Sequence, residues 1–106
     1  MISIHIQEQF KEDTITRAAG EKLRIAILDA RQKKEKIEID FSRVIIASTS
    51  FFDEAFAKLS EEGWDSTALN ENIILIGLNK NDFQVLQSVC KYRGLTLPKG
   101  WSRNCR

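Results

Sequence analysis

The sequence predicts an α/β domain in which helices pack on a small sheet. Two segments, residues 2–6 and 37–41, alternate apolar and polar side chains, as strands with one buried face do. A third segment, residues 73–78, is continuously apolar, which is typical of a strand that is internal or buried on both sides. Apolar residues at helical spacing follow each of these segments. This alternation of strands and helices is typical of helices packed on a sheet.

The composition is that of one globular domain. The chain has 106 residues, of which 42% are hydrophobic and 29% are charged, and this length supports a single core. No apolar run approaches the roughly 20 residues that a membrane span needs. The N-terminal sequence lacks the basic start and apolar middle of a signal peptide. We therefore expect a cytoplasmic protein.

The first strand is predicted from Ile2, Ile4 and Ile6, whose side chains would share one face of the sheet. His5, the only histidine, falls on the opposite, polar face. The second strand has the same alternation of apolar and polar residues. One face of the sheet is therefore expected to be less covered by helices than the other.

The first long helix is predicted over residues 17–33, after two possible N-terminal caps, Thr14 and Thr16. Its core face consists of aliphatic and small residues at helical spacing. These residues are Leu23, Ala26, Ile27 and Ala30, with Ile25 and Leu28 widening the stripe. Gly20 costs this helix about 1 kcal/mol relative to alanine, which indicates a close approach to the sheet or to a partner.

A polar turn and a second helix follow the second strand within residues 37–59. Residues 44–46 are expected to return the chain to the core. The helix is predicted from four apolar residues at i, i+3, i+4 and i+7, which are Phe52, Ala55, Phe56 and Leu59. Ser50 is the predicted N-cap, and Asp53 would return the bond three residues later. Ser50 is then either only a cap or a regulated site, because a helix start attracts phosphoryl groups.

Residues 61–72 are polar, contain Gly63 and Trp64, and are predicted to form a loop. Beyond the third strand, Asn79 and Asp82 supply a turn and a cap for a last helix, which ends at Gly94. The apolar stripe of that helix consists of Phe83, Leu86, Val89 and Cys90.

The C-terminal end is predicted to be a basic tail on a mildly acidic body. Residues 91–106 carry a formal charge of +5, and the rest of the chain carries −4. Pro98 and Gly100 disfavour further helix, although three apolar residues, Leu95, Leu97 and Trp101, can still pack. We divide the chain into a domain at residues 1–94 and a tail at residues 95–106.

Few residues suit catalysis or metal binding. A Ser-His-Asp arrangement would need His5 beside Ser50, and no pattern in the sequence brings them together. Cys90 and Cys105 have no further cysteine or histidine nearby, which argues against a zinc site, and a disulfide is not expected in a reducing compartment. No glycine-rich phosphate loop is present. We expect a non-catalytic protein with no metal and no cofactor.

Two alternatives stay open. The first is an enzyme that uses the acidic residues near Asp40 and Asp53. The second is a small nucleotide- or nucleic-acid-binding protein that uses the basic tail, with Tyr92 and Trp101 stacking on bases.

The central segment, IDFSRVIIASTSFFDEAFAKL, resembles the signature of the STAS-like domain family of unknown function, which is related to the anti-sigma factor antagonists. In that family, a strand ending in Asp-Phe leads through a hydrophobic segment and a Ser-rich turn into a helix. The matching residues here are Asp40-Phe41, residues 44–46, residues 48–50 and residues 50–59. Two further segments, GEKLR at 20–24 and IILIGLNKNDFQVL at 73–86, resemble the family's first helix and its last strand and helix.

The resemblance implies a STAS-like fold with a small mixed sheet and helices mainly on one face, acting through protein contacts. In the antagonists, a serine at the start of the corresponding helix is phosphorylated by a histidine-kinase-like ATPase, and Ser50 corresponds to that serine. The resemblance therefore implies a regulatory module that docks such a partner. The implied partner-binding residues are Ser48, Thr49, Ser50, Phe51, Asp53 and Glu54. Asp53 and Glu54 would repel a phosphate of about −2 charge.

Overall fold

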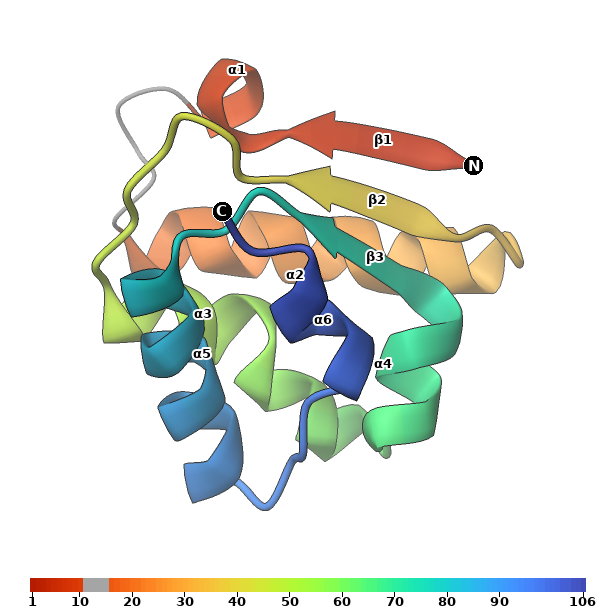
Figure 1. Ribbon diagram of the computed structural model, residues 1–106. Coiled ribbons are helices and arrows are strands. Elements are labelled where there is room, and N and C mark those ends of the chain that lie inside the picture. The colour runs from red at the N-terminus through yellow and green to blue at the C-terminus, as the bar shows by residue number, and fades with distance from the viewer. Residues whose placement is uncertain (11–15) are drawn as a thin grey trace.

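A three-stranded parallel sheet in the order β1-β2-β3 lies at the centre of the fold. The computed structural model describes residues 1–10 and 16–106, and Figure 1 shows its arrangement. The strands are β1 (Ile2–His5), β2 (Ile37–Asp40) and β3 (Ile73–Ile76). The resemblance implied a mixed sheet, but all three strands run parallel because helices connect each strand to the next.

The helices account for most of the remaining chain. They are α1 (Ile6–Phe10), α2 (Arg17–Gln32), α3 (Thr49–Ala55), the 3-10 helix η2 (Ala57–Glu62), α4 (Ser66–Asn72), α5 (Lys80–Tyr92) and α6 (Lys99–Arg103). In Figure 1, α2 runs behind the strands, and α3 and α5 lie below them. No helix in the described part of the chain is long and apolar enough to cross a membrane.

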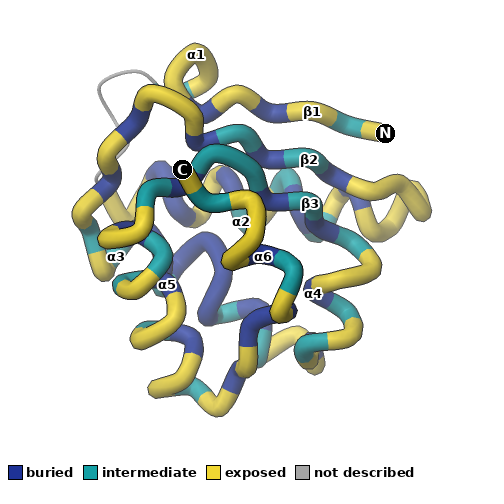
Figure 2. Tube along the Cα trace, viewed as in Figure 1, coloured by how far each residue is buried: buried dark blue, intermediate teal, exposed yellow. Residues whose placement is uncertain are grey.

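The two faces of the sheet differ in burial, as the alternation predicts. The core face carries six aliphatic residues, Ile2, Ile4, Ile37, Ile39, Ile73 and Leu75, of which all but the half-buried Ile2 are buried. The opposite face, here called the open face, carries Ser3, His5, Glu38, Asp40, Ile74 and Ile76, which are all exposed or half-buried. Figure 2 shows the buried positions gathered between the sheet and the helices.

Two strand predictions need correction. The first strand ends at His5, and Ile6 begins α1 while remaining fully buried. The apolar run at 73–78 predicted a strand that is internal or buried on both sides, but β3 is an edge strand. Its open-face residues Ile74 and Ile76 are only half-buried.

Helix α2 begins and packs largely as predicted. The Thr16 hydroxyl oxygen accepts a hydrogen bond from the Ala19 N–H at 3.0 Å, whereas Thr14 lies outside the described residues. Leu23, Ile27 and Ala30 are buried in the core. Ile25 is 56% exposed, because its position turns it away from the sheet, so it does not widen the core stripe.

Gly20 of α2 makes the predicted close approach, but its neighbour is helix α3 and not the sheet or a partner. An added Cβ would stand 2.5 Å from the Phe51 carbonyl oxygen and 2.9 Å from the Glu54 Cβ. We expect Gly20→Ala to lower the free energy of unfolding by about 1–3 kcal/mol, despite the ~1 kcal/mol by which alanine favours a helix. Urea unfolding measures the change.

The matched control for this prediction is Gly100→Ala in α6, where no atom lies within 4 Å of an added Cβ. This variant is expected to be neutral or slightly stabilising, because only the helix preference of alanine acts there. Stabilisation by Gly20→Ala of the same size as by Gly100→Ala would contradict the proposed α2–α3 contact.

The second half of the chain contains more helix than predicted. Residues 66–72 form α4 and not a loop, because the Asp65 carboxylate accepts a hydrogen bond from the Ala68 N–H at 2.9 Å and Leu69 is buried. Residues 99–103 form α6, with Pro98 in the N-cap position, so Pro98 and Gly100 do not prevent a helix here. The predicted cap of α5 is confirmed, since the Asn79 side chain accepts from the Asp82 N–H at 2.8 Å.

The C-terminal segment packs against the rest of the protein. Leu95, Leu97 and Trp101 are buried, and the Trp101 ring meets the Phe56 ring at a centroid distance of 6.1 Å. Backbone hydrogen bonds of 3.0 Å join this segment to the end of β3, from the Gly77 N–H to Asn104 and from the Arg106 N–H to Leu78.

Candidate functional site

The connection between β2 and α3, residues 41–48, is held from one side by Asp82 of α5. The Asp82 carboxylate accepts hydrogen bonds from the Ile46 N–H at 2.7 Å and the Ala47 N–H at 2.8 Å. Asp82 is only 1% exposed, and Asn79 donates a further bond to it at 2.9 Å. These charge-assisted bonds stabilise the left-handed backbone of Ala47, at a φ of 49°.

Arg106 holds the same connection from another side. Its Nη2 donates to the Val44 carbonyl oxygen, and its Nε donates to the Gly77 carbonyl oxygen at 2.7 Å. Val44 and Ile46 return to the core as predicted, but Ile45 between them is 73% exposed. A connection fixed at both sides therefore presents an isoleucine to solvent.

Helix α3 begins two residues earlier than predicted. Ser48 has an extended backbone, and its hydroxyl oxygen accepts a hydrogen bond from the Phe51 N–H at 3.2 Å. Ser48 is therefore the N-cap, and the prediction that Ser50 caps the helix is wrong. Ser50 lies half-buried in the first turn, and Thr49 before it is exposed. The side chain of Asp53 contacts other helices instead of returning a bond to Ser50.

Asp53 joins α3 to α2 and α5. Its carboxylate accepts two hydrogen bonds from Arg93, at 2.7 and 2.9 Å, and one from Arg17 at 3.2 Å. The hydrogen bonds from Arg93, followed by that from Arg17, lower the pKa of Asp53 despite partial burial. Asp53 is therefore an ionised group whose charge is compensated by two arginines.

Glu54 lies beneath the surface and binds three cations. Its side-chain oxygens accept hydrogen bonds from Arg17 at 2.8 Å, Arg24 at 2.8 Å and Lys58 at 2.6 Å. Burial raises the pKa of Glu54, but the bonds from Lys58, Arg17 and Arg24 lower it by more, to about 2. The two carboxylates and the four cations Arg17, Arg24, Lys58 and Arg93 are called the charge cluster below.

A shallow hollow of about 250 Å³ lies beside the charge cluster at the start of α3. Its lining residues are Arg17, Thr49, Asp53, Val89, Tyr92 and Arg93. Tyr92 is 92% exposed. The hollow therefore combines an exposed hydroxyl, two guanidinium groups and an exposed aromatic ring.

Comparison with family models identifies the family of this chain. A model described as a STAS-like domain of unknown function matches residues 19–83, which is more than half of the chain. The chain belongs to this family. The match includes most of α2, and all of β2, the β2–α3 connection and β3. Searches of curated proteins and of solved structures find no match.

The STAS-like domain buries part of the predicted partner-binding set. Phe51 is fully buried, where its ring contacts the rings of Phe10, Phe41 and Phe52. Glu54 is 5% exposed. These two residues support α3 from below, and the surface of the segment consists of Ser48, Thr49, Ser50 and Asp53.

The acidic residues of the enzyme alternative lie in separate environments. The Asp40 carboxylate lies 3.3 Å from the His5 ring nitrogen and accepts a hydrogen bond from the Ser42 N–H at 2.8 Å. Asp53, in contrast, belongs to the charge cluster. Burial raises the pKa of Asp40, but the bonds from Ser42 and the charge of His5 lower it by more. Within residues 1–10 and 16–106, no group of three His, Cys, Asp or Glu side chains could hold a metal ion.

The nucleic-acid alternative loses one of its two stacking residues. Trp101 is 3% exposed and packs in the core, whereas Tyr92 stays exposed. Of the basic residues at 91–106, Arg93 binds Asp53, and Arg106 binds backbone carbonyls. Lys91, Lys99 and Arg103 are exposed as well.

Several residues of this site carry little signal in the sequence. For Asp82 the sequence predicts only a turn and a cap, because Asn79 followed by an acid at the third helical position is typical of a capped helix start. Asp82 lies 36 residues after Ile46 and 35 residues after Ala47 in the sequence, so no local pattern reveals its bonds to their N–H groups. Lys58 follows Glu54 by four residues, a spacing that predicts a local ion pair. Arg17, Arg24 and Arg93 resemble any exposed basic residues in the sequence, and only the packing of α2, α3 and α5 brings them to one carboxylate pair.

Proposed function

We propose that this STAS-like domain is a non-catalytic regulatory module that docks a partner protein through the β2–α3 connection and the start of α3. The observation that carries the proposal is the exposure of Ile45 on a connection fixed by Asp82 and Arg106. A rigid surface loses less conformational entropy on binding, so more of the contact energy appears as affinity. An exposed aliphatic side chain on such a surface is suited to enter a pocket of a partner.

The residues at the start of α3 extend this surface. Thr49 is exposed, and Ser48 and Ser50 are half-buried. Their hydroxyl groups can donate to and accept from a partner. Phe51 and Glu54 act from beneath, by fixing the helix on the sheet and on α2. The partner surface is thus a rigid loop followed by one turn of helix.

A histidine-kinase-like ATPase is the partner class that we favour, because of the likeness of the central segment to the anti-sigma factor antagonists. Phosphorylation of Ser50 is the form of regulation that corresponds to that of the antagonists. The charge cluster supports it, since Asp53 and Glu54 are compensated by four cations. The repulsion on a phosphate at Ser50 is therefore weaker than the two acidic residues alone would produce.

An affinity measurement with two isoleucine variants tests the docking surface. The probe is a purified protein that contains a histidine-kinase-like ATPase domain. We expect Ile45→Asp to weaken binding at least tenfold, because the isoleucine would be removed from the contact, with unfolding by urea unchanged. Ile25→Asp on α2 is the matched control, since Ile25 is also exposed. It should bind like wild type.

The proposed docking surface would be wrong if wild type and Ile45→Asp bound the ATPase equally well. It would also be wrong if Ile45→Asp and Ile25→Asp weakened binding equally. Failure of the ATPase to bind at low salt would remove this class of partner. For regulation, Ser50→Asp should weaken binding while Ser50→Ala should not, and mass spectrometry after incubation with the ATPase and ATP should find phosphate on Ser50.

A further inference from the structure

We propose that the open face of the sheet binds one basic amphipathic helix of a partner protein. This face consists of Ser3, His5, Glu38, Asp40, Ile74 and Ile76. The inference goes beyond the proposed function, which uses the β2–α3 connection and the start of α3.

The three strands all run parallel, which is unusual for a sheet with an uncovered face. Purely parallel sheets are found almost only where helices cover both faces. Here the core face is buried against α2, α3 and α5, whereas the open face stays exposed or half-buried. Figure 1 shows α2 behind the strands and no described element in front of β1 and β2. Of the part of the chain that the structure describes, no helix supplies a second layer over β1 and β2, and α6 contacts the sheet at its edge strand β3.

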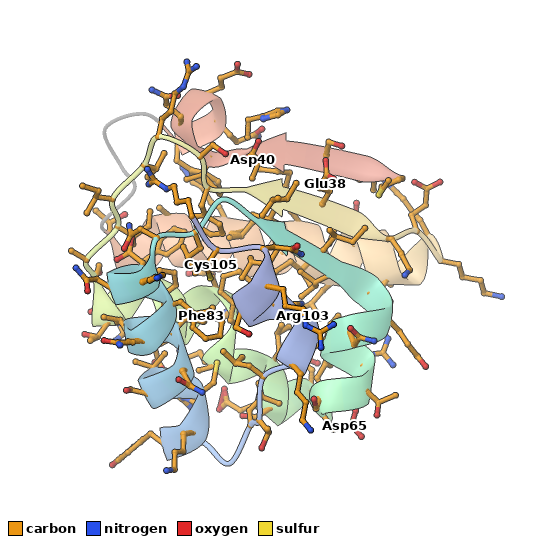
Figure 3. The ribbon with its side chains drawn as sticks, viewed as in Figure 1. Glu38, Asp40, Asp65, Phe83, Arg103 and Cys105 are labelled. Atoms are coloured by element: carbon orange, nitrogen blue, oxygen red, sulfur yellow. The ribbon has the colours of Figure 1, made fainter. Side chains whose placement is uncertain are left out.

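The chemistry of the open face selects the occupant. Ile74 and Ile76 on β3 are apolar, whereas Glu38 and Asp40 on β2 are acidic. Figure 3 shows both carboxylates extending from β2 away from α3 and α5. A fitting helix therefore places apolar side chains over β3 and lysines or arginines over β2. His5 on the same face already pairs with Asp40, whereas Glu38 has no ion pair among the described residues, and its burial without a cation would be costly.

The dimensions favour a single helix. Two spacings of about 4.8 Å separate β1 from β3, so the face is about as wide as one helix of roughly 10 Å diameter. Each strand has four residues, which corresponds to about 13 Å or two to three helical turns. A short helix of about nine residues covers this length.

Two other occupants fit the face less well. A second copy packed face to face would bring Glu38 and Asp40 of both chains together, and like charges at such an interface are unfavourable. Nucleic acid would bring phosphates onto the same carboxylates. At the carboxyl end of the face, Arg43 and Glu8 line a hollow beside His5 and Asp40, and their opposite charges leave the acidic character of β2 unchanged.

The test uses two synthetic helical peptides and the full chain labelled with ¹⁵N. The first peptide carries leucines on one flank and lysines on the other, and the second has glutamate in place of every lysine. We expect the lysine peptide to shift the amide signals of β1, β2 and β3, and the glutamate peptide to leave them unchanged. Glu38→Lys should weaken binding of the lysine peptide at least tenfold, and Glu38→Gln should weaken it less.

Glu71→Lys on α4 is the matched charge control, because Glu71 is exposed and lies away from the open face. It should bind the lysine peptide like wild type. Ile45→Asp should also bind it like wild type, which separates this inference from the proposed docking surface. Equal binding of both peptides, equal effects of Glu38→Lys and Glu71→Lys, or signal shifts confined to residues 45–50 would overturn the proposal. So would a dimer in solution that Ile74→Lys converts to a monomer, because a second copy would then occupy the face.

Discussion

Replacing Glu54 with alanine is expected to lower the free energy of unfolding by about 3–5 kcal/mol, the usual result of removing one partner from a buried ion pair. Lys58, Arg17 and Arg24 all donate to this carboxylate, which is only 5% exposed. Without it, three positive charges would stand together at the α2–α3 contact. Urea unfolding at neutral pH measures the loss.

The pH dependence of stability tests the same carboxylate through Glu54→Gln, a substitution that removes the charge and keeps the size of the side chain. Its pKa is about 2 in the folded protein, below the ordinary value of 4.5. A lowered folded pKa means that the ionised group stabilises the fold above pH 4.5, and that this contribution is lost as the pH falls toward 2. The difference corresponds to roughly 3 kcal/mol. Glu54→Gln should therefore flatten the fall in stability over this range.

The control for Glu54 is Glu61→Ala. Glu61 is exposed, and its only described ion pair is a contact of 4.0 Å with Arg93. Exposed pairs contribute at most about 1 kcal/mol, so this variant should unfold like wild type. The role given to Glu54 would be wrong if both variants lost the same stability, or if Glu54→Gln kept the full pH dependence of wild type.

The long periodic elements are the part of the fold that the sequence predicts well. Alternating isoleucines identify β1 and β2, and the spacing of Leu23, Ile27 and Ala30 identifies α2. Helices α4 and α6 have seven and five residues, which is too short for a repeated apolar stripe. Only a cap or a buried side chain reveals such helices, and the glycines and proline near them favour a loop assignment.

The sequence predicts where the candidate site lies, but it does not predict which residue caps α3 or which side chains are exposed. Three consecutive hydroxyl residues, at 48–50, all satisfy the rule for an N-cap. The choice of Ser48 follows from the burial of Phe51 and Phe52, which fixes the helix phase against the sheet. Similarly, the continuous apolar run at 44–46 does not reveal that Ile45 points outward, because no periodic pattern describes a loop held by Asp82 and Arg106.

Replacing Asp82 with alanine is expected to lower the free energy of unfolding by about 3 kcal/mol. The variant would lose charge-assisted bonds to two backbone N–H groups and leave those donors without their acceptor. The N–H groups belong to Ile46 and Ala47, and Ala47 would keep its left-handed backbone with less to stabilise it. Urea unfolding should show the loss, and amide hydrogen exchange at residues 46 and 47 should accelerate more than in the core of α2.

Asp82→Asn distinguishes local loosening of the β2–α3 connection from unfolding of the whole domain. The amide keeps one acceptor oxygen, so the expected loss is smaller, about 1–2 kcal/mol, and the domain should stay folded. Asn81→Ala, at the neighbouring exposed position, should change stability by less than about 0.5 kcal/mol. If Asp82 fixes the docking surface, Asp82→Asn should also weaken partner binding without touching the partner, because Ile45 would be presented by a mobile loop. Unchanged exchange at residues 46 and 47 in this variant would show that Asp82 does not hold the connection.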